Sequence, residues 1–405
     1  MRISAQYLEG GTESAEVPPA EARSRLHDAF ARVPLAMVLL GWDLDPRVVE
    51  ACADECARHR CDLYLWQPVL TGHGQISVDA RWRVIGLSGD PVPVLNGKPE
   101  FTFMCPNQPE AREVILRNTS EALAGGHYQG VFLDRIRFPS PAADFGRDFA
   151  CFCDACRAAA SEAGLDLMVA QEELVRLLRE QQGRQAAVSS MLLPSAPSGT
   201  GAARPTLSQL LEFRQRSISG LVREIAEMLH ARGLRVGLDC FSPTLARMVG
   251  QDLSALARSA DWIKVMTYAR AFAPASLSYE VIGLTNSLLA VDGESEERAL
   301  DFLSRVTGWP LPRRCETIRS YGLPAAVLSV ELQRGRISKP SQLLAGIELV
   351  EGPETERLGP EQMREDAEAV RAAAPDGVVF SWDLWRIRME RLELAGSLYG
   401  DAASL

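Results

Sequence analysis

A short apolar stretch of this chain ends in a carboxylate that is followed by two arginines. Residues 129–140 read QGVFLDRIRFPS, so Asp134 closes an apolar run and Arg135 and Arg137 come directly after it. Two guanidinium groups beside a carboxyl stabilise its ionised form, which suits a nucleophile or a charge stabiliser better than a proton donor. The alternative interpretation is a structural ion pair under the loop.

Two further acids stand in or after apolar runs. Glu331 lies inside VLSVELQ, and we expect it to be buried on a strand. A buried carboxyl without a partner stays protonated, which suits general acid catalysis, and the alternative is a hydrogen-bonded core residue. Asp239 follows VGL and is the reserve for the acid or base role; its alternative is a cap for the loop CFSPT.

Aromatic and polar residues accompany these acids where the predicted strands end. Carboxylates can act as acid, base or nucleophile at an anomeric centre, and aromatic rings offer flat apolar faces to a sugar. The pattern therefore predicts a carbohydrate substrate and catalysis by Asp134 with Glu331 or Asp239. The residues expected to bind the sugar are Trp42, Trp66, Asn107, Arg137, Tyr268, Trp382 and Asp383.

Three of the nine cysteines form a C-x-C-x-x-C run at Cys151, Cys153 and Cys156. With Cys105 they can form a closed tetrahedral zinc site, which would be structural and would fix the long loop after the fourth predicted strand. Cys240 competes with Cys105 as the fourth ligand, and ordinary buried thiols are the alternative to a metal. No pattern for an organic cofactor is present: the chain has neither a P-loop nor a G-x-S-x-G elbow.

These residues must be positioned by a repeated βα architecture. Short β-branched or aromatic runs alternate with segments of helical period, such as those that begin at Pro46 and Pro109. This pattern predicts a (β/α)8 barrel, in which strand ends converge on one face. The alternative, a doubly wound sheet, lacks its Gly-rich loop after the first predicted strand. The eight predicted strands are 34–42, 62–69, 101–106, 130–138, 235–242, 262–269, 325–332 and 377–384.

The expected organisation is one catalytic domain over residues 26–400, preceded by an N-terminal extension over 1–25. The segment 140–230 is too long for a simple crossover after the fourth strand, so it is predicted to be a helical and loop insertion. Within it, the Pro-, Gly- and Ser-rich tract 191–205 has no periodicity and reads as a mobile surface loop.

Composition excludes several classes of partner. The net charge of -10 over 405 residues argues against nucleic acid as a partner, because binding to phosphates relies on clustered Lys and Arg. The N-terminus lacks the apolar core of a signal peptide, and no apolar run is long enough to span a bilayer. We therefore expect a cytoplasmic protein that does not bind membranes.

The motifs resemble those of bacterial glycoside hydrolases of the (β/α)8 type. GVFLDRIRFPS resembles their fourth-strand motif F-D-Y-x-R-F-P, while WIKVMTYA and GVVFSWDLW look like the sixth and eighth strands of such barrels, chitinase-like ones included. The cysteine arrangement is similar to the zinc cluster of family-42 β-galactosidases. The resemblance implies hydrolysis of glycosidic bonds, with Asp134 matching the motif's Asp.

The chain also departs from these families. It lacks the D-x-x-D-x-D-x-E ending of chitinases and the Asn-Glu pair that zinc-bearing β-galactosidases carry on strand four. Two other functions stay open at this point. One is a sugar-binding barrel without catalysis. The other is a lyase or isomerase acting on a phosphorylated or carboxylated metabolite, with LQRGRISKPS, which includes Gly335, as a phosphate loop after the seventh strand.

Overall fold

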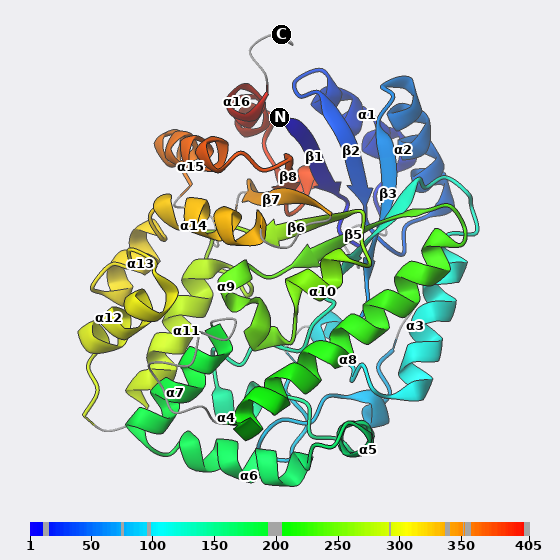
Figure 1. The fold of residues 1–405 in the computed structure, drawn as a ribbon. Coiled ribbons are helices and arrows are strands. Elements are labelled where there is room, and N and C mark those ends of the chain that lie inside the picture. The colour runs from blue at the N-terminus through cyan, green and yellow to red at the C-terminus, as the bar shows by residue number, and fades with distance from the viewer. Residues whose placement is uncertain are drawn as a thin grey trace.

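Eight parallel strands form a closed barrel in chain order, surrounded by helices (Figure 1). The computed structural model describes residues 1–10, 16–73, 77–94, 99–192, 205–290, 293–336, 341–350, 352 and 358–400. The strands are β1 (Arg2–Tyr7), β2 (Leu35–Leu40), β3 (Asp62–Pro68), β4 (Gly130–Asp134), β5 (Arg235–Cys240), β6 (Trp262–Met266), β7 (Gln342–Glu348) and β8 (Gly377–Ser381). The predicted (β/α)8 fold is confirmed.

The barrel interior is a packed apolar layer, separate from the larger core between strands and helices. Because side chains alternate between the two faces of a strand, every second residue points inward. The inward apolar side chains are Met37, Leu39, Trp42, Tyr64, Trp66, Phe132, Trp262, Leu344 and Val379. The barrel is therefore filled by side chains and is not a pore.

Helices cover the outside of the barrel (Figure 1). Two begin at the predicted prolines, and the Asp45 side chain caps the first of them by accepting a hydrogen bond from Arg47 N at 2.8 Å. Outside the β4–β5 connection, the helices are α1 (Pro19–Phe30), α2 (Pro46–Arg58), α3 (Pro109–Ala122), α9 (Pro243–Ala246), α10 (Leu253–Ala257), α11 (Leu277–Leu289), α12 (Glu296–Thr307), α13 (Cys315–Tyr321), α14 (Ala326–Gly335), α15 (Pro360–Ala373) and α16 (Met389–Tyr399). Among the described residues, none of the helices has the length and hydrophobicity needed to cross a bilayer.

The predicted insertion after β4 is present as a run of helices before β5. It contains α4 (Phe145–Asp148), α5 (Asp154–Glu162), α6 (Leu167–Leu177), α7 (Gln181–Leu192) and α8 (Pro205–His230). Helix α7 packs against α9 and α11, so the insertion contacts elements that follow β5 and β6. Of the predicted loop tract, residues 193–204 lie outside the described residues.

The sequence analysis did not predict two of the strands, β1 and β7, because their apolar patterns are weaker than those of the other six. Residues 2–7, expected in an extension before the barrel, form β1. The run 325–332 was predicted to be the seventh strand, but it lies largely within α14, and the true β7 is 342–348. A short apolar run can be a buried strand or a buried helix, and its periodicity does not decide between them.

The predicted strand 101–106 is also wrong. Phe103 and Met104 form isolated antiparallel bridges with Thr71 and Arg83, inside the connection between β3 and α3. The apolar side chains of this segment are buried against the outer core, which explains their strand-like pattern without a place in the barrel.

Gly237 provides a test of the interior packing. A Cβ atom at this position of β5 would lie 2.1 Å from the Trp262 ring, so Gly237→Ala forces the barrel interior to move. Overpacking of this kind destabilises a core by about 1–3 kcal/mol. We expect that loss in the free energy of unfolding measured with urea.

Gly220→Ala is the matched control for this variant. Gly220 lies in α8, where a Cβ atom would meet nothing within 4 Å, and alanine should stabilise the helix by up to about 1 kcal/mol. Equal effects of the two substitutions would contradict the packing described here.

Candidate active site

Asp134 is held at the carboxyl end of β4 by two hydrogen bonds. Its Oδ2 accepts from Trp66 Nε1 at 3.0 Å, and its Oδ1 accepts from the Arg135 backbone N at 2.5 Å. The Arg135 guanidinium lies 4.0 Å from Oδ2. The expected Asp–Arg contact therefore exists, but only one of the two arginines, Arg135, makes it within 4.0 Å among the described residues.

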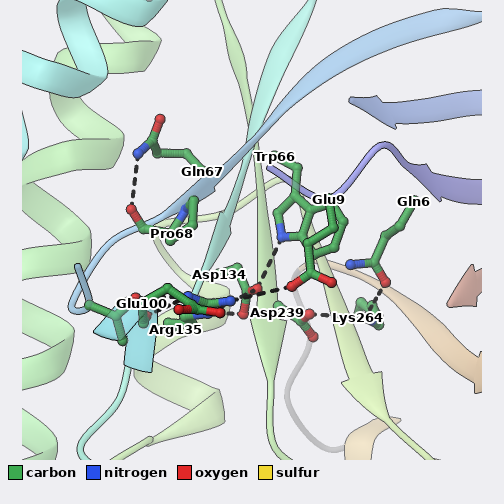
Figure 2. Close-up of polar contacts among 11 residues, drawn as sticks. Gln6, Glu9, Trp66, Gln67, Pro68, Glu100, Asp134, Arg135, Asp239 and Lys264 are labelled. Carbon is green, nitrogen blue, oxygen red and sulfur yellow. Dashed lines mark hydrogen bonds and ion pairs between the residues drawn. The ribbon is translucent and has the colours of Figure 1, made fainter. Parts of the chain in front are cut away.

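Asp239, the reserve acid, occupies the equivalent position on the neighbouring strand. Leu133 of β4 pairs with Leu238 of β5, so Asp134 and Asp239 are the next residues in register. Adjacent strands lie about 4.8 Å apart, and both residues are at strand positions whose side chains point into the barrel. The two carboxyl groups therefore emerge side by side at the mouth, as Figure 2 shows.

A fully buried lysine holds one oxygen of Asp239. Lys264 Nζ donates to Asp239 Oδ2 at 2.9 Å and to Gln6 Oε1 at 2.9 Å, and Ser381 Oγ donates to the same Gln6 oxygen at 2.7 Å. Asp239 Oδ1 is buried and has no hydrogen-bond partner among the described residues. Burial raises the pKa of Asp239 to about 7, against the opposing effect of Lys264 and with a further rise from Asp134.

Glu9 brings a third carboxyl to this group. It follows β1, and its Oε1 lies 3.4 Å from Arg135 Nη2 (Figure 2). Its side chain is 30% exposed, which makes it the most accessible of the three acids. Burial raises the pKa of Glu9 to about 7, Arg135 lowers it, and Asp383 and Asp134 raise it further.

Asp383 was expected to bind sugar hydroxyls, but its oxygens are already used. Its carboxylate accepts from Leu8 N at 2.8 Å, from Glu9 N at 3.2 Å and from Trp385 N at 3.0 Å. It therefore joins the segment after β8 to the end of β1 and fixes the backbone of Glu9. These contacts position the backbone of that acid.

Glu331 was predicted to be on a strand at the barrel face, and this is wrong. It lies on α14, fully buried, and accepts from Thr244 N at 2.8 Å and from Trp309 Nε1 at 2.8 Å. Arg334 Nη1 is 3.1 Å from the same carboxyl. A carboxylate with this many donors is a structural link between α14 and α9, which was the alternative interpretation. Among the described residues, its hydrogen bonds and ion pair do not involve Asp134, Asp239 or Glu9.

Glu348 is a further buried acid, at the end of β7. It accepts from Arg270 N at 2.6 Å and from Ala271 N at 3.2 Å. Burial and the nearby Asp366 raise the pKa of Glu348 to about 8. Because it lines a small space together with Met363 and Asp366 of α15, it faces the surrounding helices and is separate from the group around Asp134.

The four predicted aromatic residues form two contacts. Trp42 and Trp66 meet edge to face with their ring centroids 5.2 Å apart, and both are 2% exposed. Tyr268 and Trp382 stack with their centroids 5.2 Å apart. Trp42 and Trp66 are thus buried in the barrel interior next to Asp134. Trp382 of the second pair is only partly buried.

Arg137 points into a pocket beside the acids. The pocket has a volume of about 250 Å³ and is also lined by Phe103, Phe241 and Glu280. Arg137 therefore remains positioned to contact a bound molecule, and Asp134 lies three residues earlier in the chain at the end of the adjoining strand.

The four predicted cysteines come together in one buried cluster. The sulfur atoms of Cys105, Cys151, Cys153 and Cys156 all lie within 4.8 Å of one another, with Cys105 Sγ 3.3 Å from Cys156 Sγ and 3.5 Å from Cys153 Sγ. The neighbouring thiols raise the pKa of Cys105, because several sulfurs cannot ionise together without a cation. The cluster can hold a metal ion, and Cys240, the competing ligand, is not among its members.

Asn107 was expected at the sugar site, but it serves the cysteine cluster. Its Nδ2 lies 3.3 Å from Cys156 Sγ and donates to Ser217 Oγ at 3.0 Å, and its backbone N donates to Cys105 Sγ at 3.4 Å. Ile85 N donates to Cys151 Sγ at 3.3 Å. Backbone donors of this kind stabilise thiolates.

Three residues of the site escaped the sequence analysis: Gln6, Glu9 and Lys264. Gln6 lies in β1 and Glu9 follows it, within residues 1–25, for which the sequence predicts an N-terminal extension. The alternation in ISAQY, with Ser4 and Gln6 between apolar residues, was a period-two signal for a strand. Lys264 stood inside the predicted strand WIKVM, where a charged residue signals an interior partner.

Comparisons with known proteins identify the architecture. No family model matches the chain, and no curated protein matches it in sequence. The glycoside hydrolase domain of PgaB (BpsB) from Bordetella bronchiseptica is 14% identical, with a TM-score of 0.55 over 99% of both chains.

Two larger enzymes share the fold. A polyextremophilic β-galactosidase from Halorubrum lacusprofundi is 15% identical, with a TM-score of 0.57 over 98% of this chain and 57% of that one. The α-L-fucosidase isoenzyme 2 from Paenibacillus thiaminolyticus is 12% identical, with a TM-score of 0.54 over 98% of this chain and 49% of that one. This chain thus spans about half the length of those two enzymes. The structural neighbours are glycoside hydrolases, and at these identities the likeness shows a shared fold.

Lys264→Met tests the buried charge pair. Removing one partner of a buried ion pair leaves the other charge uncompensated and costs about 3–5 kcal/mol. We expect that loss in the free energy of unfolding at pH 8, measured with guanidinium chloride. Adding Asp239→Asn to Lys264→Met should recover part of the loss, because the buried carboxyl group that has lost its partner is then gone. A double variant no more stable than Lys264→Met would show that the two side chains are not coupled.

Proposed function

We propose that this protein hydrolyses glycosidic bonds, with Asp134 and Asp239 as the paired carboxyl groups. The observation that supports this proposal most strongly is their placement at equivalent positions of β4 and β5, at the barrel mouth. Both oxygens of Asp134 accept hydrogen bonds, whereas Asp239 keeps one oxygen without a partner among the described residues. In (β/α)8 enzymes the carboxyl ends of the strands form the active face. The glycoside hydrolases among the structural neighbours support the same reaction class.

The two carboxyl groups suit different roles. Asp239 is the proposed proton donor: its raised pKa keeps it protonated below about pH 7, and its Oδ1 has no competing partner. It would transfer its proton to the glycosidic oxygen as the bond from that oxygen to the anomeric carbon breaks. Asp134, whose carboxyl group is oriented by Trp66 Nε1 and the Arg135 backbone N, would bond to or stabilise the anomeric carbon on the other face of the sugar. Water then completes hydrolysis and returns the proton.

Glu9 is the second candidate for the proton donor. It also has a pKa raised to about 7, and its greater exposure gives it easier access to a leaving group. Its contact with Arg135 links it to the same group of residues. The two candidates are distinguished by the variants described below.

The phosphate-binding alternative loses its structural basis. Gly335 ends α14 and precedes β7, whereas the phosphate sites of such barrels follow strands seven and eight. Residues 337–340 of that motif lie outside the described residues. The other alternative is a sugar-binding barrel without catalysis. It is tested by measuring turnover in variants of Asp134 and Asp239.

The pH dependence of turnover tests the assignment of the acids. Because protonated Asp239 is the active form and its pKa is about 7, kcat/KM should fall as the pH rises through 7. Asp239→Asn should lower kcat by about 10²–10⁴-fold and remove this alkaline decline. Asp134→Asn should lower kcat by a similar factor. Rates are measured on whichever of a panel of aryl glycosides the wild-type protein cleaves.

Glu331→Gln is the matched acid-to-amide control. Since Glu331 bonds only within the helical layer, this variant should lower stability by about 1–3 kcal/mol and leave kcat/KM unchanged at temperatures where it is folded. Loss of the alkaline decline in Glu9→Gln instead of Asp239→Asn would assign the proton donor to Glu9. Full turnover in Asp134→Asn would contradict the proposed reaction.

The cysteine cluster is proposed to bind a structural zinc ion. Four buried thiols match the donor set of closed zinc sites, and Zn–S bonds of about 2.3 Å place tetrahedral sulfurs about 3.8 Å apart, close to the separations seen here. A zinc tetrathiolate is a dianion. The fully buried Arg214, whose Nε donates to Ala150 O at 2.6 Å, interacts electrostatically with Cys151 and Cys156 and would balance part of this charge.

Metal analysis of the purified protein tests this zinc site. We expect about one zinc ion per chain, measured by inductively coupled plasma mass spectrometry. Cys153→Ser should reduce the zinc content and lower the melting temperature. Cys315→Ser, which removes a buried thiol on α13 outside the cluster, should leave the zinc content unchanged. Wild-type protein that contains no zinc when purified, or that keeps its melting temperature after treatment with a chelator, would contradict the proposal.

A further inference from the structure

The pocket that contains Arg137 is not occupied by the proposed catalytic residues. It has a volume of about 250 Å³ and is formed by the segment after β4, the segment after β5 and the start of α11. Its wall includes Arg137, Phe241 and Glu280. The acids at the barrel mouth do not line this pocket, but Asp134 and Asp239 both interact electrostatically with Arg137.

The guanidinium group of Arg137 is held by aromatic rings and makes few polar contacts. Its central carbon lies 5.0 Å from the ring centroid of Phe103 and 4.7 Å from that of Phe241. Its Nη1 donates to the Phe138 carbonyl at 3.2 Å, and its Nε has no partner within the part of the chain that the structure describes. Among the described residues it forms no ion pair within 4.0 Å, although it is only 7% exposed. The two rings therefore enclose the guanidinium group, and its Nε remains available to a bound molecule.

The charge of Arg137 is not neutralised by a contact. Burial lowers the pKa of Arg137 to about 10, and Asp134 and Glu280 offset only part of that effect. A buried cation without a contacting anion is costly, so an incoming anion is favoured there.

The other charged groups of the pocket already have partners. Arg147 is paired with Asp148 through contacts of 2.6 Å and 2.7 Å. Glu280 accepts from Ser140 Oγ and from Ala275 N, and its burial raises its pKa, which favours the neutral form. Arg137 is therefore the group in this pocket that can receive a new ionic contact.

We propose that this pocket is a subsite for the carboxylate of an acidic sugar, so that the substrate contains a uronic acid bound through Arg137. This inference rests on the proposed glycosidase function and specifies its substrate class. A planar guanidinium fork matches a carboxylate in two parallel hydrogen bonds. A hydroxyl group can accept one of these bonds but cannot balance the charge.

Matched glycosides test the subsite by binding and by turnover. The probes are the 4-nitrophenyl glucuronides and galacturonides and the corresponding neutral glucosides and galactosides, in both anomers. Binding to the full chain is measured by calorimetry, and hydrolysis by release of nitrophenol. At least one uronide should bind roughly 30-fold more tightly than its neutral counterpart.

Two Arg137 variants and one control test whether Arg137 causes the preference for uronides. Arg137→Gln should abolish it, and Arg137→Lys, which keeps the charge but loses the fork, should retain only part of it. Arg223→Gln removes an exposed arginine of α8 outside the pocket and should leave the preference intact. Arg137→Lys also provides a readout if Arg137→Gln does not fold.

The outcomes separate this inference from the proposed function. Equal binding of the uronide and neutral members of every pair, or a preference that survives Arg137→Gln, would overturn the subsite. Hydrolysis of neutral glycosides with no uronide preference would leave the glycosidase proposal standing and remove the subsite alone. A preference for uronides in binding, lost in Arg137→Gln and without any hydrolysis, would support the subsite and contradict the glycosidase proposal.

Discussion

The ammonium group of Lys264, enclosed inside the barrel, is the constraint on which the arrangement of the site depends. A buried charge costs several kcal/mol unless it is paired and hydrogen-bonded. Its partners come from other strands: Asp239 from β5 and Gln6 from β1, which in turn is held by Ser381 of β8. Meeting this requirement orients Asp239 with one oxygen bound and the other without a partner, at the mouth beside Asp134. Stability of the interior and orientation of the acid thus have the same cause.

Two further devices position the groups around this pair. Asp383 binds three backbone amides and so ties the chain after β8 to the end of β1, which places Glu9. The cysteine cluster joins the connection between β3 and α3 to the start of α5 in the insertion. These links explain why acids, aromatic residues and Arg137, which come from distant parts of the chain, meet at one face of the barrel.

The sequence predicted the barrel because six of its strands have strong apolar runs. It also singled out Asp134, Asp239 and the four cysteines by their types and positions, and the structure places the two acids on neighbouring strand ends and the cysteines in one cluster. It failed where local pattern was ambiguous. AAVLSVEL suits a buried helix as well as a strand, so Glu331 was assigned to the wrong surface. Asn107 and Asp383 were placed near the correct elements, but their hydrogen-bond partners depend on tertiary contacts that no local pattern encodes. Glu9 was missed because β1, the strand that precedes it, has polar residues at half of its positions.

The most direct test of this account is the protonation of Asp239 in the folded protein. Carbon-13 NMR of the side-chain carboxyl groups, with the Asp239 signal assigned by its loss in Asp239→Asn, gives this value without any substrate. The account predicts a titration midpoint near 7, as expected for a buried carboxyl beside Asp134. A midpoint near the ordinary aspartate value of about 3.9 would show that Asp239 is ionised at neutral pH and would contradict its role as the proton donor.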